Sequence, residues 1–210
     1  VAYKPNLAFY ECYGIEGLRA LDATVDYIRT KYPEIFLIAD AKRGDIGNTA
    51  KMYAKAFFEE MDFDAVTIAP YMGADSVTPF LEYKDKWAIV LALTSNASAY
   101  QFQTAQKNGK PLYQAVMEEM MEISTPDNMM FVVGATKADK LEELRSFCPD
   151  NFFLVPGVGA QGGSAEEVIA HGANDHGGLL INSSRGILFA DSTEDYAKAA
   201  GEVAAKTACI

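Results

Sequence analysis

The chain lacks an excess of positive charge. Its 210 residues contain 18 Lys and Arg against 29 Asp and Glu, which gives a formal net charge of −11. General nucleic-acid binders neutralise phosphates with a stripe of Lys and Arg, and no such stripe is present here. The composition therefore argues against a nucleic-acid partner, although a few local cations could still hold a small anionic ligand.

Cysteine is scarce as well. The three cysteines, Cys12, Cys148 and Cys209, are widely spaced and form no C-x-x-C pattern, which is typical of reduced thiols in a cytoplasmic protein. We find no signal-peptide pattern, and no apolar run approaches the roughly 20 residues needed to cross a bilayer. We therefore expect a cytoplasmic localisation and no membrane partner.

Several motifs of catalysis are also missing. The chain contains no Walker loop, no H-E-x-x-H and no G-x-S-x-G motif. His171 and His176 lie five residues apart in a glycine-rich segment, with no cysteine or third ligand nearby. We therefore expect no metal site at these histidines.

Short apolar runs alternate with amphipathic segments along the whole chain. The runs predict strands at 1–4, 35–40, 65–69, 88–94, 130–134, 152–158 and 179–182. The segments between them predict helices near 15–31, 48–61, 76–83, 111–123, 137–147, 164–171 and 193–206. Near-continuous hydrophobic strands that alternate with helices indicate a parallel sheet covered by helices.

The predicted fold class is α/β, a (β/α)₈ TIM barrel forming a single domain over residues 1–210. Such a barrel needs eight strands in about 250 residues, with about 200 near the lower limit. The first visible strand begins at Val1, so we expect the first βα unit to be missing from this chain and to lie upstream. A doubly wound open sheet is the structural alternative. The polar stretch 96–110 is the longest connection, which makes it a candidate functional loop.

Residues 40–49 read DAKRGDIGNT and follow directly on the apolar run 35–39. Asp40 and Lys42 are two residues apart, so in a strand their side chains leave from the same face. Asp45 follows where the chain turns into a helix. Charges at the end of a buried strand are costly unless they are paired or used on a substrate. A structural salt bridge for Asp40 and Lys42, and a helix N-cap for Asp45, are the alternatives.

Polar residues collect at the carboxyl ends of the predicted strands, where the active sites of (β/α)₈ barrels lie. They are Lys4, Asp40, Lys42, Thr94, Ser95, Gln161 and Arg185.

The glycines at 157, 159 and 162 match the G-x-G-x-x-G pattern of dinucleotide-binding folds, but the match is weak. The acidic residue expected about 20 positions further on falls near Asn182, which is neutral. A loop that approaches phosphate or closes over a ligand is the better interpretation. Together with Arg185 it fits the phosphate site that barrels build from their last two loops. A surface ion pair is the alternative for Arg185.

Taken together, these segments resemble the orotidine 5′-phosphate decarboxylase family. The motif at 40–46, DAKRGDI, resembles its D-x-K-x-x-D signature. Four further segments are similar to the longer bacterial type of this family and occur in the same order: 4–11, 94–96, 156–163 and 182–187. The resemblance covers nearly the whole chain.

The resemblance implies a homodimer that converts orotidine 5′-monophosphate to UMP and CO₂ in pyrimidine biosynthesis, without metal or organic cofactor. It implies that Lys42 donates a proton to C6 of the pyrimidine and that Asp40 lies beside the departing carboxylate. Lys4 would complete an alternating array of lysines and aspartates and contact the ribose. Asp45 and Thr49 would reach across the dimer into the neighbouring site.

The resemblance also implies a role for three residues later in the chain. Ser95 would hydrogen-bond the pyrimidine edge, and Gln161 and Arg185 would bind the phosphate. Two alternatives stay open: a magnesium-dependent phosphosugar decarboxylase or aldolase of the same superfamily, and a truncated inactive barrel that binds phosphorylated ligands. The family also places a ribose-contacting Asp at the end of the first strand, which we expect upstream of Val1.

Overall fold

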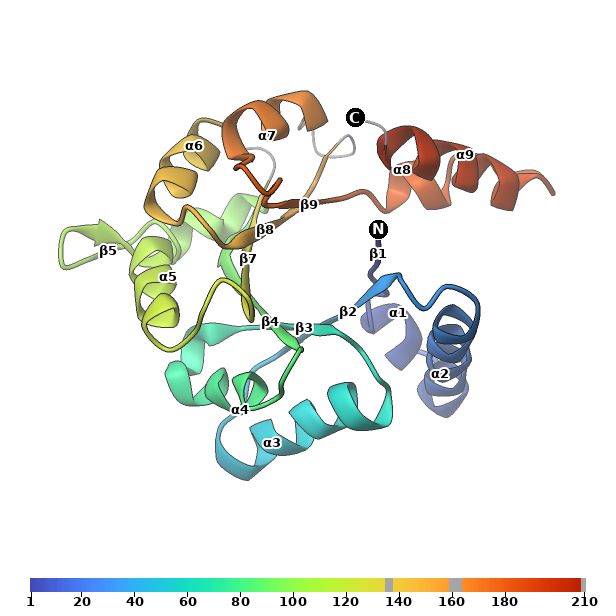
Figure 1. Ribbon diagram of the computed structural model, residues 1–210, viewed down its shortest axis with the longest axis horizontal. Helices are drawn as coiled ribbons and strands as arrows, with labels where there is room; N and C mark the ends of the chain where they lie inside the picture. The colour runs from blue at the N-terminus through green and yellow to red at the C-terminus, as the bar shows by residue number, and fades with distance from the viewer. Residues whose placement is uncertain (135–137, 159–163, 209–210) are drawn as a thin grey trace. The chain divides into compact units, whose positions relative to one another are not determined.

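A computed structural model describes residues 1–134, 138–158 and 164–208 (Figure 1). Its main strands are β1 (Ala2–Tyr3), β2 (Phe36–Arg43), β3 (Ala65–Ile68), β4 (Trp87–Leu93), β7 (Met129–Val133), β8 (Phe152–Pro156) and β9 (Leu179–Asn182). The α-helices are α1 (Ala8–Glu11), α2 (Gly14–Lys31), α3 (Gly47–Lys55), α4 (Thr78–Leu81), α5 (Leu112–Glu122), α6 (Ala138–Phe147), α7 (Ala165–Gly172), α8 (Arg185–Leu188) and α9 (Tyr196–Ala208). Short helical turns are η1 (Ala56–Glu60), η2 (Pro70–Met72), η3 (Ala74–Ser76) and η4 (Ala97–Gln101).

The main sheet has the strand order β1-β2-β3-β4-β7-β8-β9, which is also the order along the chain. The pairs β1–β2, β2–β3, β3–β4 and β8–β9 are parallel. A doubly wound sheet would reverse its strand order at a switch point, whereas successive βα units of a barrel follow one another around the sheet. The α/β class with barrel topology is therefore confirmed, and the doubly wound alternative is not favoured.

The long connection 96–110 contains structure that the sequence patterns do not predict. It begins with η4 and ends in a two-stranded hairpin formed by β5 (Gln106–Lys107) and β6 (Lys110–Pro111). Asn108 and Gly109 between these strands have φ values of 54° and 81°, as a tight Asn-Gly hairpin turn requires. The flanking residues are polar, so no apolar alternation marks these strands.

The chain divides into two compact units. Unit 1 comprises Val1–Ala92 and Lys107–Met130, and unit 2 comprises Leu93–Gln106 and Phe131–Ile210. The single domain expected over residues 1–210 stays a prediction.

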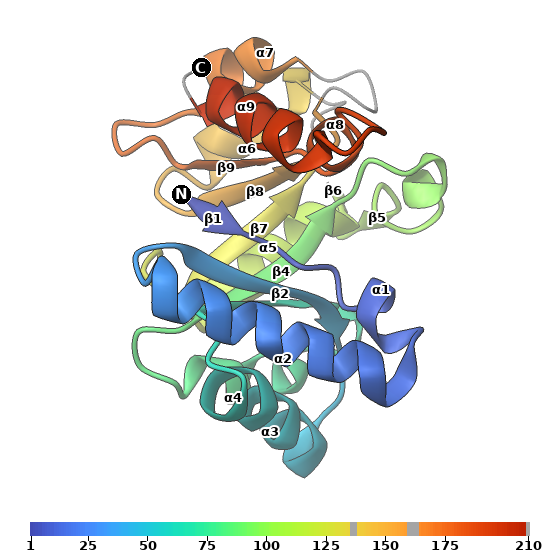
Figure 2. The ribbon, with the colours of Figure 1, turned by 90° about the vertical axis from the view of Figure 1, so that its right-hand side faces the viewer.

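The core of unit 1 is built from β2, β3 and β4 and from the buried face of α2. Leu21, Val25 and Ile28 of α2 are buried, and their spacing of four and three places them on one helical face. That helix packs against α1 (Figure 2). Gly17 permits the contact, because a Cβ at this position would lie 1.8 Å from the carbonyl oxygen of Tyr10.

The core of unit 2 is built from β8 and from the helices α6 and α7. Arg145 of α6 fixes the amino ends of β8 and β9, since its guanidinium donates hydrogen bonds to backbone carbonyls on both sides. The acceptors are the carbonyls of Gly172, Cys148, Pro149, Asn151 and Gly178. Gly172 ends α7 and Cys148 directly follows α6, where carbonyls have no partner within the helix. Asn151 and Gly178 directly precede β8 and β9. No helix in the described part of the chain is long and apolar enough to cross a membrane.

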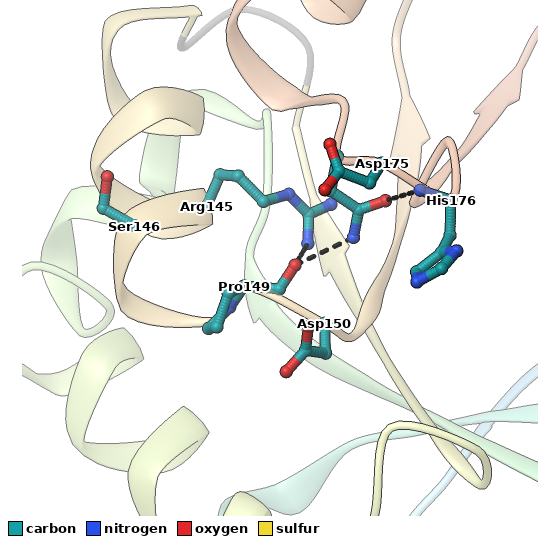
Figure 3. Close-up of a pocket in the computed structure, with 7 residues that line it drawn as sticks. Arg145, Ser146, Pro149, Asp150, Asp175 and His176 are labelled. Carbon is teal, nitrogen blue, oxygen red and sulfur yellow. Dashed lines mark hydrogen bonds between the residues drawn. The ribbon is translucent and has the colours of Figure 1, made fainter.

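Arg145 also borders a cavity of about 290 Å³ (Figure 3). The lining residues are Arg145, Ser146, Pro149, Asp150, Asn174, Asp175 and His176. His176 lies at its rim, where its backbone N–H donates to the Asn174 side chain at 3.0 Å. Because the guanidinium of Arg145 is already bonded to backbone carbonyls, we interpret this cavity as a structural feature of the α6–β8 connection.

Candidate active site

Three charged residues meet in unit 1 where β1 and β2 end. Lys4 follows β1, and its Nζ donates to Oδ2 of Asp40 at 2.6 Å. Nζ of Lys42 donates to the other carboxylate oxygen, Oδ1. Asp40 thus holds one ammonium group on each of its oxygens.

Backbone pairing explains why Lys4 lies beside Asp40. In the parallel pair β1–β2, Tyr3 is opposite Leu37. The backbone N–H of Asp40 then donates to the carbonyl of Pro5 at 3.0 Å, and its carbonyl accepts from the N–H of Leu7 at 3.2 Å. These two bonds bring the chain that follows Lys4 alongside Asp40.

The end of β2 departs from regular strand geometry. The register pairs Ala39 with Val66 and Arg43 with Ile68, so β2 advances by four residues while β3 advances by two. Lys42 lies in this bulge with φ at 48°, a left-handed conformation that is unfavourable for a residue with a Cβ. Bulges of this kind redirect side chains next to functional sites.

Thr67 of β3 joins this cluster, and the sequence analysis missed it. Its Oγ1 donates to Oδ1 of Asp40 at 3.2 Å and accepts from the backbone N–H of Lys42 at 2.9 Å. Thr67 is 1% exposed. The sequence offers one signal for this role, a hydroxyl side chain within an otherwise apolar strand. That signal is weak, because threonine is common in β-strands for structural reasons alone.

The surroundings keep Asp40 ionised. Its side chain is 9% exposed, and this burial by itself raises the pKa of the carboxyl. The positive charge of Lys4 and the hydrogen bonds from Lys4 and Lys42 outweigh burial, so the pKa of Asp40 lies below its ordinary value. The side chain of Lys4 is 11% exposed and that of Lys42 is 49% exposed. Lys42 is therefore the ammonium group that a ligand in solution can reach.

Arg43 ties the end of β2 to neighbouring helices. Its guanidinium forms an ion pair with Glu11 of α1. It also lies 5.4 Å from the ring centroid of Tyr53 and 5.5 Å from that of Phe57, within the range of cation–π attraction. The side chain of Arg43, the residue after Lys42, is thereby held by Glu11 and by the two aromatic rings.

Asp45 and Thr49 lie on the segment that follows β2, beyond the charged cluster. Asp45 is half-buried, and its Oδ1 accepts from the backbone N–H of Ile46 at 2.8 Å. The N-cap of α3 is Ile46, and no side chain makes the capping hydrogen bond. The alternative in which Asp45 caps this helix is therefore wrong. Thr49 is exposed in the first turn of α3.

Ser95 and Thr94 belong to unit 2, at the end of β4. Ser95 is half-buried and packs against Gly134, where a Cβ would lie 2.8 Å from the Cβ of Ser95. The side-chain amide of Gln103 accepts from the backbone N–H of Thr94 and donates to its hydroxyl, both at 2.8 Å. Gln103 thus closes the long connection back onto the strand end.

Arg185 begins α8 in unit 2 and is exposed. Within residues 1–134, 138–158 and 164–208 it forms no ion pair, so the structure does not support the surface ion pair considered for it. Gln161 and most of the glycine-rich loop lie outside the described residues.

In the same described ranges, no group of three or more His, Cys, Asp or Glu side chains could hold a metal ion.

Comparison with known proteins gives consistent results. The model of the orotidine 5′-phosphate decarboxylase / HUMPS family matches residues 1–200. Among curated proteins, the orotidine 5′-phosphate decarboxylase of Phocaeicola vulgatus is 56% identical over 207 residues, which are 98% of this chain and 76% of the relative. The same enzyme of Porphyromonas gingivalis is 52% identical over 98% of this chain and 75% of the relative.

Solved structures agree with the sequence comparison. The orotidine monophosphate decarboxylase of Leishmania donovani has a TM-score of 0.86 and 38% identity over 99% of this chain and 80% of that chain. The enzyme of Methanocaldococcus jannaschii, solved with the inhibitor BMP, has a TM-score of 0.72 over 96% of this chain and 83% of that chain; at 21% identity it supports the fold alone. With the family model spanning almost all of its residues, this chain belongs to the orotidine 5′-phosphate decarboxylase / HUMPS family.

Proposed function

We propose that this chain decarboxylates orotidine 5′-monophosphate to UMP and CO₂, with Lys42 as the proton donor. One observation carries the proposal: a half-exposed ammonium group is fixed on a buried, ionised carboxylate whose second oxygen holds another lysine. Family membership and the curated relatives support the same reaction. The role in pyrimidine biosynthesis and the cytoplasmic location belong to this proposal.

In the proposed step, the bond between C6 and the substrate carboxylate breaks and the carboxylate leaves as CO₂. The electron pair stays on C6, where the nearby ammonium of Lys42 stabilises the developing negative charge. Lys42 then transfers a proton to C6, and water returns a proton to the neutral amine. No metal or organic cofactor enters this proposal.

Asp40 has two roles in the proposal. It holds the ammonium group of Lys42 in place, because Oδ1 of Asp40 accepts a hydrogen bond from its Nζ. It also lies beside the substrate carboxylate, which it repels in the ground state and less so as CO₂ departs. Lys4 keeps Asp40 ionised and contacts the ribose.

Binding is assigned to residues further along the chain. We propose that Ser95 hydrogen-bonds the pyrimidine edge and that Gln161 and Arg185 bind the phosphate. The phosphate is remote from the reacting carbon, yet its binding energy can drive loop closure and so raise the rate as well as the affinity.

The proposal also includes a homodimer, in which Asp45 and Thr49 contribute to the neighbouring site. Large apolar side chains are exposed close to them in sequence and on the segment after β3. They are Ile46 (45% exposed), Met52 (60%), Tyr71 (89%) and Met72 (49%). Contiguous exposed apolar side chains form surfaces that bind another protein, and most soluble oligomers are built from copies of one chain.

The test follows the loss of orotidine 5′-monophosphate absorbance in the presence of a chelator. We expect turnover by the wild-type chain and almost none by Lys42→Ala, with UMP binding retained in both. Lys84→Ala is the matched control, because Lys84 is 92% exposed and pairs only with its neighbour Asp85 among the described residues.

Each contrary result points to a different alternative. Turnover that the chelator abolishes would favour a magnesium-dependent decarboxylase or aldolase. Tight UMP binding without turnover by the wild-type chain would indicate an inactive phosphate-binding barrel. Full activity of Lys42→Ala would refute the proton-donor role.

A further inference from the structure

We propose that Thr67 is a positioning residue of this site, whose hydroxyl locks the Asp40 carboxylate to the backbone of Lys42. The inference deepens the proposed decarboxylation and rests on it. It adds a residue on a different strand from the D-x-K-x-x-D motif, with an uncharged side chain that hydrogen-bonds Asp40 and the backbone of Lys42.

The first step of the argument is the bulge at the end of β2. Regular pairing of β2 with β3 stops after Ala39 and resumes at Arg43, whose carbonyl accepts from the N–H of Ala69 at 2.8 Å. Within the interruption, the N–H of Lys42 finds its partner in the hydroxyl of Thr67. Backbone N–H groups within a sheet are normally paired, and this side chain replaces a bond that the sheet no longer supplies.

The second step concerns the conformation of Lys42. Its φ of 48° is unfavourable for a residue with a Cβ, and such a conformation persists only where its surroundings fix it. The hydrogen bond from the Lys42 N–H to Thr67 acts at the strained residue itself. Thr67 therefore helps to hold the backbone in the conformation that brings Nζ of Lys42 to Asp40.

The third step is that the same hydroxyl also orients the carboxylate. Oδ1 of Asp40 accepts from both Thr67 and Lys42, while Oδ2 accepts from Lys4. A hydroxyl has one proton to donate and lone pairs to accept with, and Thr67 uses both capacities within this cluster. It therefore fixes the Asp40 side chain and the Lys42 main chain relative to each other.

The test compares Thr67→Val with Thr67→Ser. Valine keeps the volume of the side chain and removes both hydrogen bonds, whereas serine keeps the hydroxyl. We expect kcat to fall by about 10- to 100-fold in Thr67→Val with a much smaller change in KM, and Thr67→Ser to return to within about threefold of wild type.

A pH measurement separates positioning from a merely structural role. In Thr67→Val, Asp40 loses one donor to its ionised form, while Lys4 and Lys42 still face it. Its pKa should therefore rise, which moves the acidic limb of the kcat profile to higher pH. The same rise should appear in an NMR titration of the Asp40 carboxyl carbon.

Ser76→Ala is the control for loss of a buried hydroxyl. Ser76 is fully buried in unit 1, and its Oγ donates to the carbonyl of Gly73 at 2.7 Å, outside the charged cluster. We expect Ser76→Ala to lower thermal stability without moving the acidic limb or the Asp40 titration.

The outcomes distinguish this inference from the proposed function. An unchanged kcat and pH profile in Thr67→Val, or a failure of Thr67→Ser to restore activity, would overturn the positioning role. If the wild-type chain does not turn over the substrate, the proposed function fails. In that case the NMR titration still tests the contact between Thr67 and Asp40 without any need for turnover. An Asp40 pKa that is equal in wild type and Thr67→Val would overturn the positioning role.

Discussion

At the scale of single residues, the site is organised around the carboxylate of Asp40. Its side chain is 9% exposed and forms ion pairs with two lysines. Part of this arrangement is predictable from sequence. Lys4 follows β1 and Asp40 lies in the carboxyl half of β2, and the carboxyl ends of consecutive parallel strands meet at one edge of a sheet. Thr67 is not predictable in the same way, because its bonds to Asp40 and Lys42 depend on a bulge that no local pattern encodes.

The lowered pKa of Asp40 predicts a pH dependence of stability. A carboxyl whose pKa is lower in the folded than in the unfolded chain stabilises the fold above its unfolded value, and this contribution disappears as pH falls through the folded value. Asp40→Asn removes the titrating group. We expect the loss of unfolding free energy between about pH 5 and pH 2.5 to be smaller in Asp40→Asn than in wild type.

Urea unfolding at several pH values in this range measures the effect. Asp75→Asn is the control, since Asp75 is an exposed carboxylate in unit 1. An identical pH dependence in wild type and Asp40→Asn would show that the two lysines do not stabilise the ionised form of Asp40 in the folded chain.

At the scale of elements, strands were more predictable than helix details. The periodic pattern 48–61 predicts one helix, but the structure ends α3 at Lys55 and continues as the π-helical turn η1. The wider turn accommodates two adjacent buried aromatics, Phe57 and Phe58, which pack against Phe63 and Phe80 respectively. The four-residue helices α1 and α8 are too short to show any periodicity.

The contact between α1 and α2 predicts opposite effects for the same substitution in two helices. Gly17→Ala should destabilise the protein by about 1–3 kcal/mol, because the new methyl group would overlap the backbone carbonyl of Tyr10. Gly201→Ala in α9 has open space around it and should stabilise by up to about 1 kcal/mol, from helix propensity.

Urea denaturation of both variants at one pH provides the measurement, with Gly201→Ala serving as the matched control. A Gly17→Ala variant as stable as wild type would contradict the close approach of α1 to α2.

At the scale of the whole molecule, the proposed roles are spread over both units. Lys4, Asp40, Lys42 and Thr67 lie in unit 1, whereas Ser95 and Arg185 lie in unit 2. The strand order and the family follow from patterns along the chain, since each βα unit carries its own apolar run and its own polar strand end. Quaternary structure is harder to predict from sequence, because the residues of an interface do not recur at the fixed spacing that marks a helix or a strand.

The proposed dimer predicts complementation between inactive variants. Lys42→Ala and Asp45→Ala should each be inactive alone, and a heterodimer of the two should contain one intact site. Equal mixing with random exchange makes about half of the dimers mixed, so activity should recover to roughly a quarter of wild type.

The measurement is turnover after the two variants are unfolded and refolded together. A mixture of Lys4→Met and Lys42→Ala is the control and should show no recovery, because both lysines bind the same Asp40. Recovery in the control, or none in the test mixture, would contradict sites shared in the proposed way.

The left-handed backbone of Lys42 places stability and activity in conflict at this position. At a φ of 48°, glycine is the residue that the backbone accepts most readily, and glycine has no ammonium group to offer. A selection for thermal resistance alone would therefore replace the residue to which we assign the chemistry. The left-handed backbone at this position therefore costs stability that a glycine would recover.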